Sequence, residues 1–276
     1  MNWQPNWQAY LWSSLAAARI SGSLLLRKKR ILFLGILVLL PALIPIAVAL
    51  LRGPHDRVAS GLELFALLGE YGFLSTLAPL AAILLGTALV GDDLEQGTAP
   101  YLLTRAVPRS ALVAGKFLAY ALVASLTFLP AMALTLAAVA VTTSDPIAAG
   151  PLVSLFAHTF GVVVLALGVY GALCCMLGTL TKRPVIYAVI FVFGWEPLTR
   201  LVPGYVDFLT VKKHLLALWP VVTVDRIDHS IDVTRKVIDV GPGEASLILA
   251  LVALAFVGAT TYALRHKEFA RGQNLA

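Results

Sequence analysis

The chain has 276 residues, of which 59% are hydrophobic and only 13% are charged, and its mean hydropathy is +0.86. Soluble domains are typically about 25% charged and 45–50% apolar, so this composition excludes an ordinary soluble domain and indicates a protein of the lipid bilayer. The net charge of +6 does not point to nucleic acid, because the Lys and Arg residues lie mostly beside apolar runs, where they set orientation in a membrane.

Residues 1–30 are amphipathic rather than membrane-spanning. Trp3, Trp7, Leu11 and Leu15 recur every four residues, as on one face of a helix. Trp-rich amphipathic segments tend to lie at the membrane interface, so we expect an interfacial helix here, with a flexible tail as the alternative. The basic run Arg27–Arg30 and the long apolar run after it favour a retained anchor over a cleaved signal peptide.

Six segments are long enough to cross the membrane, since a spanning helix needs about 20 mostly apolar residues. They are Ile31–Leu51, Tyr71–Val90, Phe117–Thr142, Leu152–Leu180, Val185–Val206 and Ala245–Leu264. Before the second, Leu62–Leu68 suggests an interfacial turn on the outer side. Within the fourth, the adjacent Cys174 and Cys175 are expected to pack as small apolar residues rather than form a disulfide. The distribution of Lys and Arg predicts that both termini are cytoplasmic.

The stretch Gly91–Lys116, between the second and third apolar runs, carries three carboxylates, a Gly-Thr break and then three cations. Gly97 supplies the flexible backbone that ends the preceding helical turn. The residues of functional interest in this cytoplasmic loop are Asp92, Asp93, Glu95, Gln96, Gly97, Thr98, Arg105 and Arg109.

This loop resembles the first cytoplasmic loop of ABC-2 type exporter permeases. The resemblance lies in the order of an acidic turn, Gly-Thr, a short Leu-rich helix, two arginines and Gly-Lys entering a membrane helix. In that family the loop carries the coupling helix that docks on the ATP-binding subunit. The resemblance therefore implies that the eight residues contact an ATPase subunit, although Ala106 and Pro108 depart from the family pattern. A solvated connector is the alternative.

The fifth apolar run contains an ionisable residue. Eleven apolar residues, Val185–Trp195, precede Glu196, which places its carboxyl roughly halfway through a ~30 Å hydrocarbon core. Arg200 is the expected partner, four residues further on. Whether this intramembrane ion pair is structural or gates transport stays open. The run is similar to the fifth helix of many ABC-2 permeases, which implies short re-entrant helices after it, expected at Val206–Leu209 and Leu215–Trp219.

The long outer segment after the fifth run is polar and mixed in charge. The Val and Ile alternation in Ile231–Val240 permits a short strand. Residues 207–243 either dock an extracytoplasmic partner or form a solvated cap. His158, at the outer end of the fourth run, is expected to hydrogen-bond a neighbouring helix rather than a metal.

The sequence lacks the chemistry of an enzyme. Gly115-Lys116 is followed by Phe117 rather than Ser or Thr, so the chain has no phosphate-binding loop for ATP, and no metalloprotease or hydrolase motif occurs. No catalytic, cofactor-binding or metal-binding residue is assigned.

Together these features predict an all-α membrane protein with a single domain over residues 1–276. It comprises six transmembrane helices, an N-terminal interfacial helix, a cytoplasmic coupling helix and re-entrant helices after the fifth span. The resemblance implies a non-catalytic permease subunit of an ATP-driven exporter in the cytoplasmic (inner) membrane, dimeric with a second copy or a paralogue. ATP and Mg would be bound by a partner ATP-binding subunit. The alternative is an ion-coupled secondary transporter using Glu196, whose halves should then show a repeat; none is evident.

Overall fold

A computed structural model of the chain describes residues 7–26, 29–51, 61–89, 109–142, 149–199, 208, 210–220 and 240–266. All regular structure in these ranges is helical. The elements are α1 (Trp7–Leu26), α2 (Lys29–Leu51), α3 (Gly61–Leu67), η1 (Leu68–Leu77), α4 (Ala78–Ala81), η2 (Ala82–Gly86), α7 (Arg109–Thr142), α8 (Ala149–Leu180), α9 (Pro184–Val189), η3 (Ile190–Trp195), α10 (Glu196–Thr199), α11 (Val211–Ala217) and α12 (Pro242–His266). The three η elements are π-helices.

Within the described residues, five helical stretches are long and apolar enough to cross a membrane. They are Lys29–Val48, Leu64–Gly86, Ser110–Val141, Leu152–Leu180 and Pro242–Leu264. The fifth expected span, 185–206, is represented by the shorter apolar helix Pro184–Thr199, which falls short of the roughly 20 residues that a full span needs. Residues 200–207 lie outside the described ranges. The all-helical membrane architecture is therefore confirmed, with five of the six expected spans at full length.

The second span is longer than its hydrophobicity suggested. The turn expected at Leu62–Leu68 is wrong, because α3 runs directly into η1 as one helical rod. Phe65 is fully buried there, so packing against the bundle favours helix over the expected turn. In η1 the Thr76 hydroxyl donates to the Tyr71 carbonyl, five residues back, at 2.8 Å, a spacing that matches the wider π-helical turn.

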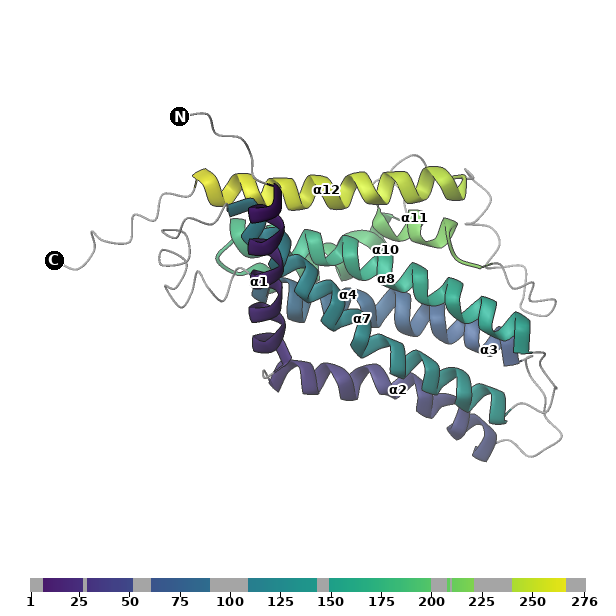
Figure 1. Ribbon diagram of the computed structural model, residues 1–276. Helices are drawn as coiled ribbons and strands as arrows, with labels where there is room; N and C mark the ends of the chain where they lie inside the picture. Colours follow the sequence, from purple (N-terminus) through teal and green to yellow (C-terminus); the bar gives the residue numbers. More distant parts are fainter. Residues whose placement is uncertain are drawn as a thin grey trace.

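Helix α1 crosses the end of the bundle. The long helices run side by side, whereas α1 runs across them, beside the C-terminal end of α12 (Figure 1). One face of α1 is buried at Ala18 and Leu25, and the other faces expose Trp12, Ile20 and Leu24. Helix α1 thus lies crosswise at one end of the bundle, and its place in the membrane interface stays a prediction.

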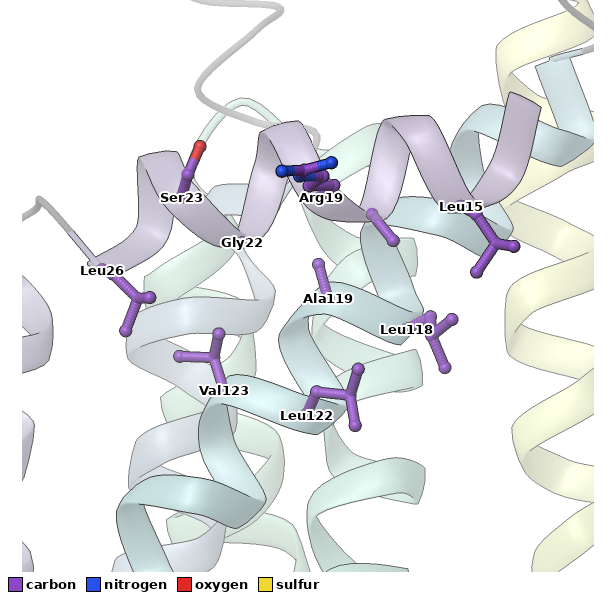
Figure 2. A pocket seen from close by; sticks show the side chains of 10 residues that line it. Leu15, Arg19, Gly22, Ser23, Leu26, Leu118, Ala119, Leu122 and Val123 are labelled. Carbon is purple, nitrogen blue, oxygen red and sulfur yellow. The ribbon is translucent and has the colours of Figure 1, made fainter. Parts of the chain in front are cut away.

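An apolar groove of about 460 Å³ follows the crossing of α1 and α7. Leu15 and Leu26 of α1 and Leu118, Leu122 and Val123 of α7 line it, and Ser23 points away from α7 (Figure 2). Helices α1 and α7 thus pack against each other, and the groove lies beside their contact.

The second span and α7 pack closely against α8 at three glycines. A Cβ atom on Gly86 would lie 2.9 Å from the Cys174 Cβ, and one on Gly178 would lie 2.7 Å from the Thr87 carbonyl oxygen. A Cβ on Gly171 would collide with the Tyr120 ring of α7. Glycine at these positions lets the three helices approach closely, as is common in membrane bundles.

The centre of the bundle confirms the interpretation of the cysteines. Cys174 and Cys175 are both free and buried. Next to them, fully buried Tyr120 donates a hydrogen bond from its hydroxyl to the Leu167 carbonyl of α8 at 3.0 Å. A polar group within the bundle is therefore satisfied by a neighbouring helix.

Candidate functional site

The predicted coupling loop falls almost entirely outside the described residues, which stop at residue 89 and resume at 109. Asp92, Asp93, Glu95, Gln96, Gly97, Thr98 and Arg105 therefore keep their assignment as a prediction. Arg109, expected in the loop, is the first residue of α7. The helix thus begins eight residues before the apolar run Phe117–Thr142, because its first two turns need not lie in hydrocarbon.

The two ends of the loop are joined by a lysine. Lys116 of α7 is only 8% exposed, and its Nζ donates a hydrogen bond to the Leu89 carbonyl oxygen at 3.0 Å. Leu89 follows the second span, Leu64–Gly86, and is the last described residue before the loop. The buried Lys116 ammonium gives this carbonyl a hydrogen-bond partner. Lys116 therefore holds the end of the second span against the start of α7.

The neighbouring Gly115 fixes α1 at the same place. A Cβ at this position would collide with the Ser14 carbonyl oxygen of α1 and lie 2.8 Å from the Ala17 Cβ. The backbones of α1 and α7 therefore touch, which only glycine permits. The Gly-Lys pair thus connects α1, the end of the second span and the start of α7, so that the loop and the crosswise helix share one anchor.

The short helix α11 is held against the bundle by two side-chain contacts. His158 Nε2 of α8 donates to the Leu218 carbonyl, which ends α11, at 3.0 Å; this confirms that His158 bonds a neighbouring helix. Trp219 packs so closely on the second span that a Cβ on Gly69 would lie 2.8 Å from its ring. The expected helix Leu215–Trp219 overlaps the end of α11 at Leu215–Ala217, and its re-entrant character stays a prediction. Val206–Leu209 lies mostly outside the described residues.

Glu196 lies where η3 ends and α10 begins, and it is only 3% exposed. The Tyr170 hydroxyl of α8, itself buried, donates to Glu196 Oε2 at 2.7 Å. The Lys212 ammonium and the backbone amides of Val211 and Lys212 in α11 also face this carboxyl. Oε1 has no hydrogen-bond partner. The carboxyl thus joins three elements and retains one unused acceptor.

A small cavity of about 60 Å³ lies beside this carboxyl. Its lining residues come from η1, from η3 and α10, and from α11; they are Ser75, Val192, Phe193, Glu196, Pro197 and Lys212. Ser75 Oγ is buried and, like Glu196 Oε1, has no hydrogen-bond partner. Two unsatisfied polar atoms therefore border one cavity.

The expected Glu196–Arg200 pair stays a prediction, because Arg200 lies outside the described residues. Tyr170, Ser75 and Lys212 escaped prediction. Each is distant from Glu196 in the chain and becomes its neighbour only through packing. The one usable signal was the hydroxyl of Tyr170 within an apolar run, since a buried Tyr hydroxyl usually finds a partner.

Among the residues that the structure describes, no three His, Cys, Asp or Glu side chains gather into a group that could hold a metal ion. Residues 22–195 match the sequence model of the family described as ABC-2 family transporter protein. No curated protein matches the chain. The matched region contains α2, the predicted loop, the Lys116 anchor, α7 and α8, and it ends next to Glu196.

Proposed function

Because the chain belongs to the ABC-2 family of transporter proteins, a family of membrane transport components, we propose that it is the permease subunit of an ATP-driven exporter. In this proposal the chain forms the substrate pathway as a dimer, with a second copy or a paralogue. Hydrolysis takes place in separate cytoplasmic ATP-binding subunits, which hold ATP and Mg. The family match, which includes the loop between the second span and α7, is the observation that carries this function.

The proposed coupling element is the loop that contains Asp92, Glu95, Arg105 and their neighbours. Its support is the anchor at its base. Lys116 bonds the Leu89 carbonyl, and Gly115 seats α7 on α1. A force applied to the loop by an ATPase subunit would therefore reach the second span, α7 and α1 together, rather than being absorbed by a loose connection.

The proposed orientation places this anchored end in the cytoplasm. The start of α7 and the C-terminal end of α12 lie at the same end of the bundle as α1 (Figure 1). The basic residues before α2 and after α12 follow the positive-inside rule at that end. With α1 in the inner leaflet interface, α11 and residues 207–243 face the outer side of the cytoplasmic (inner) membrane, where an extracytoplasmic partner would dock.

Co-purification tests the proposal. The full chain, extracted in mild detergent from cells that express it with its native partners, should retain an ATP-binding protein, and the reconstituted complex should transport substrate with ATP. The chain alone, in liposomes supplied with ATP, should transport nothing. ATP-driven transport by the isolated chain, or a chain that never retains an ATPase, would refute the coupling.

The second candidate function is ion-coupled secondary transport with Glu196 as the carrier site. The observation behind it is the buried carboxyl with one unpaired oxygen. A carrier needs this group to change its charge during transport, so Glu196→Gln would abolish transport without loss of stability. An ABC permease that uses Glu196 only for packing would retain ATP-driven transport in the same variant.

A further inference from the structure

The small cavity beside Glu196 is lined by two buried polar atoms that lack hydrogen-bond partners. These atoms are Glu196 Oε1 and Ser75 Oγ. Only 3% of the Glu196 side chain is exposed. Leaving such groups unsatisfied in an apolar interior is costly, and native proteins usually pair them with protein or ordered water.

The size and charge of the cavity select the class of ligand. Its volume is about 60 Å³, and one water molecule occupies about 30 Å³ in the liquid. The wall carries a carboxyl from Glu196, an ammonium from Lys212 and a hydroxyl from Ser75. Since the carboxylate and the ammonium balance each other, a bare cation or anion would meet a like charge. A small neutral molecule that both donates and accepts hydrogen bonds fits all three groups.

We propose that this cavity binds one or two ordered water molecules that bridge Ser75 Oγ and Glu196 Oε1. The water donates a hydrogen bond to Glu196 Oε1 and accepts one from the Ser75 hydroxyl. Each of these two buried oxygens thereby gains a hydrogen-bond partner. The bridge joins η1 of the second span to the helix Pro184–Thr199 and, through Lys212, to α11. On the other side of the carboxyl, Tyr170 makes the matching direct bond at 2.7 Å. This inference concerns the chain alone and holds whichever partner drives transport.

A structure of the full chain in its membrane complex, at a resolution that shows ordered water, tests the site directly. The expected result is a solvent peak within hydrogen-bond distance of both Ser75 Oγ and Glu196 Oε1. An empty cavity, a metal ion, or a protein side chain such as the Arg200 guanidinium in that position would overturn the proposal.

Substitution of Ser75 gives an independent test, because a dry and a hydrated cavity predict opposite changes in thermal stability. In a dry cavity, Ser75→Ala removes an unsatisfied buried hydroxyl and should leave stability unchanged or raise it. In a hydrated cavity, the same change removes a partner of the water and should lower the melting temperature by about 2–4 °C. Ser75→Thr, which keeps the hydroxyl, is the matched control and should melt close to the wild type. A Ser75→Ala protein at least as stable as the wild type would exclude the bridging water.

Discussion

Replacing Lys116 with Met tests whether the base of the predicted coupling loop is held by one buried ammonium. Methionine keeps an unbranched apolar side chain in the same space and removes only the charge and the donor. The change leaves the Leu89 carbonyl without the hydrogen bond that Lys116 Nζ gives it at 3.0 Å. The second span and α7 should then separate more easily at the loop, and the folded state should lose stability.

The magnitude follows from burial. Lys116 is 8% exposed, so water cannot readily replace the lost bond. A hydrogen bond that involves a charged group contributes about 1.5–3 kcal/mol. Each kcal/mol shifts the melting temperature of a domain of 150–250 residues by about 2–4 °C. Lys116→Met should therefore lower the melting temperature by roughly 3–12 °C.

Thermal unfolding of the purified chain, followed by tryptophan fluorescence in one detergent, is the appropriate assay. Lys182→Met is the control, because Lys182 is exposed in the turn between α8 and α9, and surface substitutions usually change stability by less than about 0.5 kcal/mol. If Lys116→Met and Lys182→Met melt at the same temperature as the wild type, the contact with Leu89 does not anchor the loop.

Three further substitutions test other parts of the structure. Gly171→Ala should destabilise the chain by about 1–3 kcal/mol, because the new methyl displaces Tyr120; Gly168→Ala, on the same helix with nothing within 4 Å, should be neutral or stabilising, and equal melting of the two variants would contradict the close packing. Glu95→Ala and Arg105→Ala should each weaken retention of the ATPase subunit in pull-downs while membrane insertion stays normal; unchanged retention and unchanged ATPase stimulation in both would identify the loop as a connector. Arg200→Ala should be destabilising by about 3–5 kcal/mol if it leaves Glu196 without its charged partner, and adding Glu196→Gln should restore part of the melting temperature with ATP-driven transport retained. No rescue in that double variant would show that Glu196 and Arg200 are not coupled.

Long apolar runs were the part of the fold that sequence could predict. Three of them, including Leu152–Leu180, coincide with spans to within a few residues, because the bilayer demands that length regardless of tertiary contacts. The second span was misjudged at its start, because Leu62–Leu68 was expected to be an interfacial turn but is helical, with Phe65 buried. The fifth, Val185–Val206, is described only as far as Thr199, so its last residues stay a prediction.

The candidate site was only half predictable, for a related reason. Glu196 was identifiable because a carboxyl in an apolar run is rare. Its bond with Tyr170, 26 residues away, depends on how α8 faces the helix Pro184–Thr199, and hydrophobicity alone does not determine that rotation. The same holds for Gly115. Its role at the Gly-Lys motif suggested a helix entry, but its contact with Ser14 requires the position of α1.

The glycine contacts between the second span and α8 restrict how this molecule can move. Gly86 and Gly178 leave no room for a sliding or rotating side chain between the two helices, so these helices and α7 should travel as one rigid body. By contrast, only 22% and 17% of the apolar windows of α2 and α12 are buried within the chain, against 61% for the fourth span. We therefore expect opening and closing to displace α2 and α12 relative to the second span, α7 and α8. In hydrogen–deuterium exchange, the amides of α2 and α12 should open before those around Gly171.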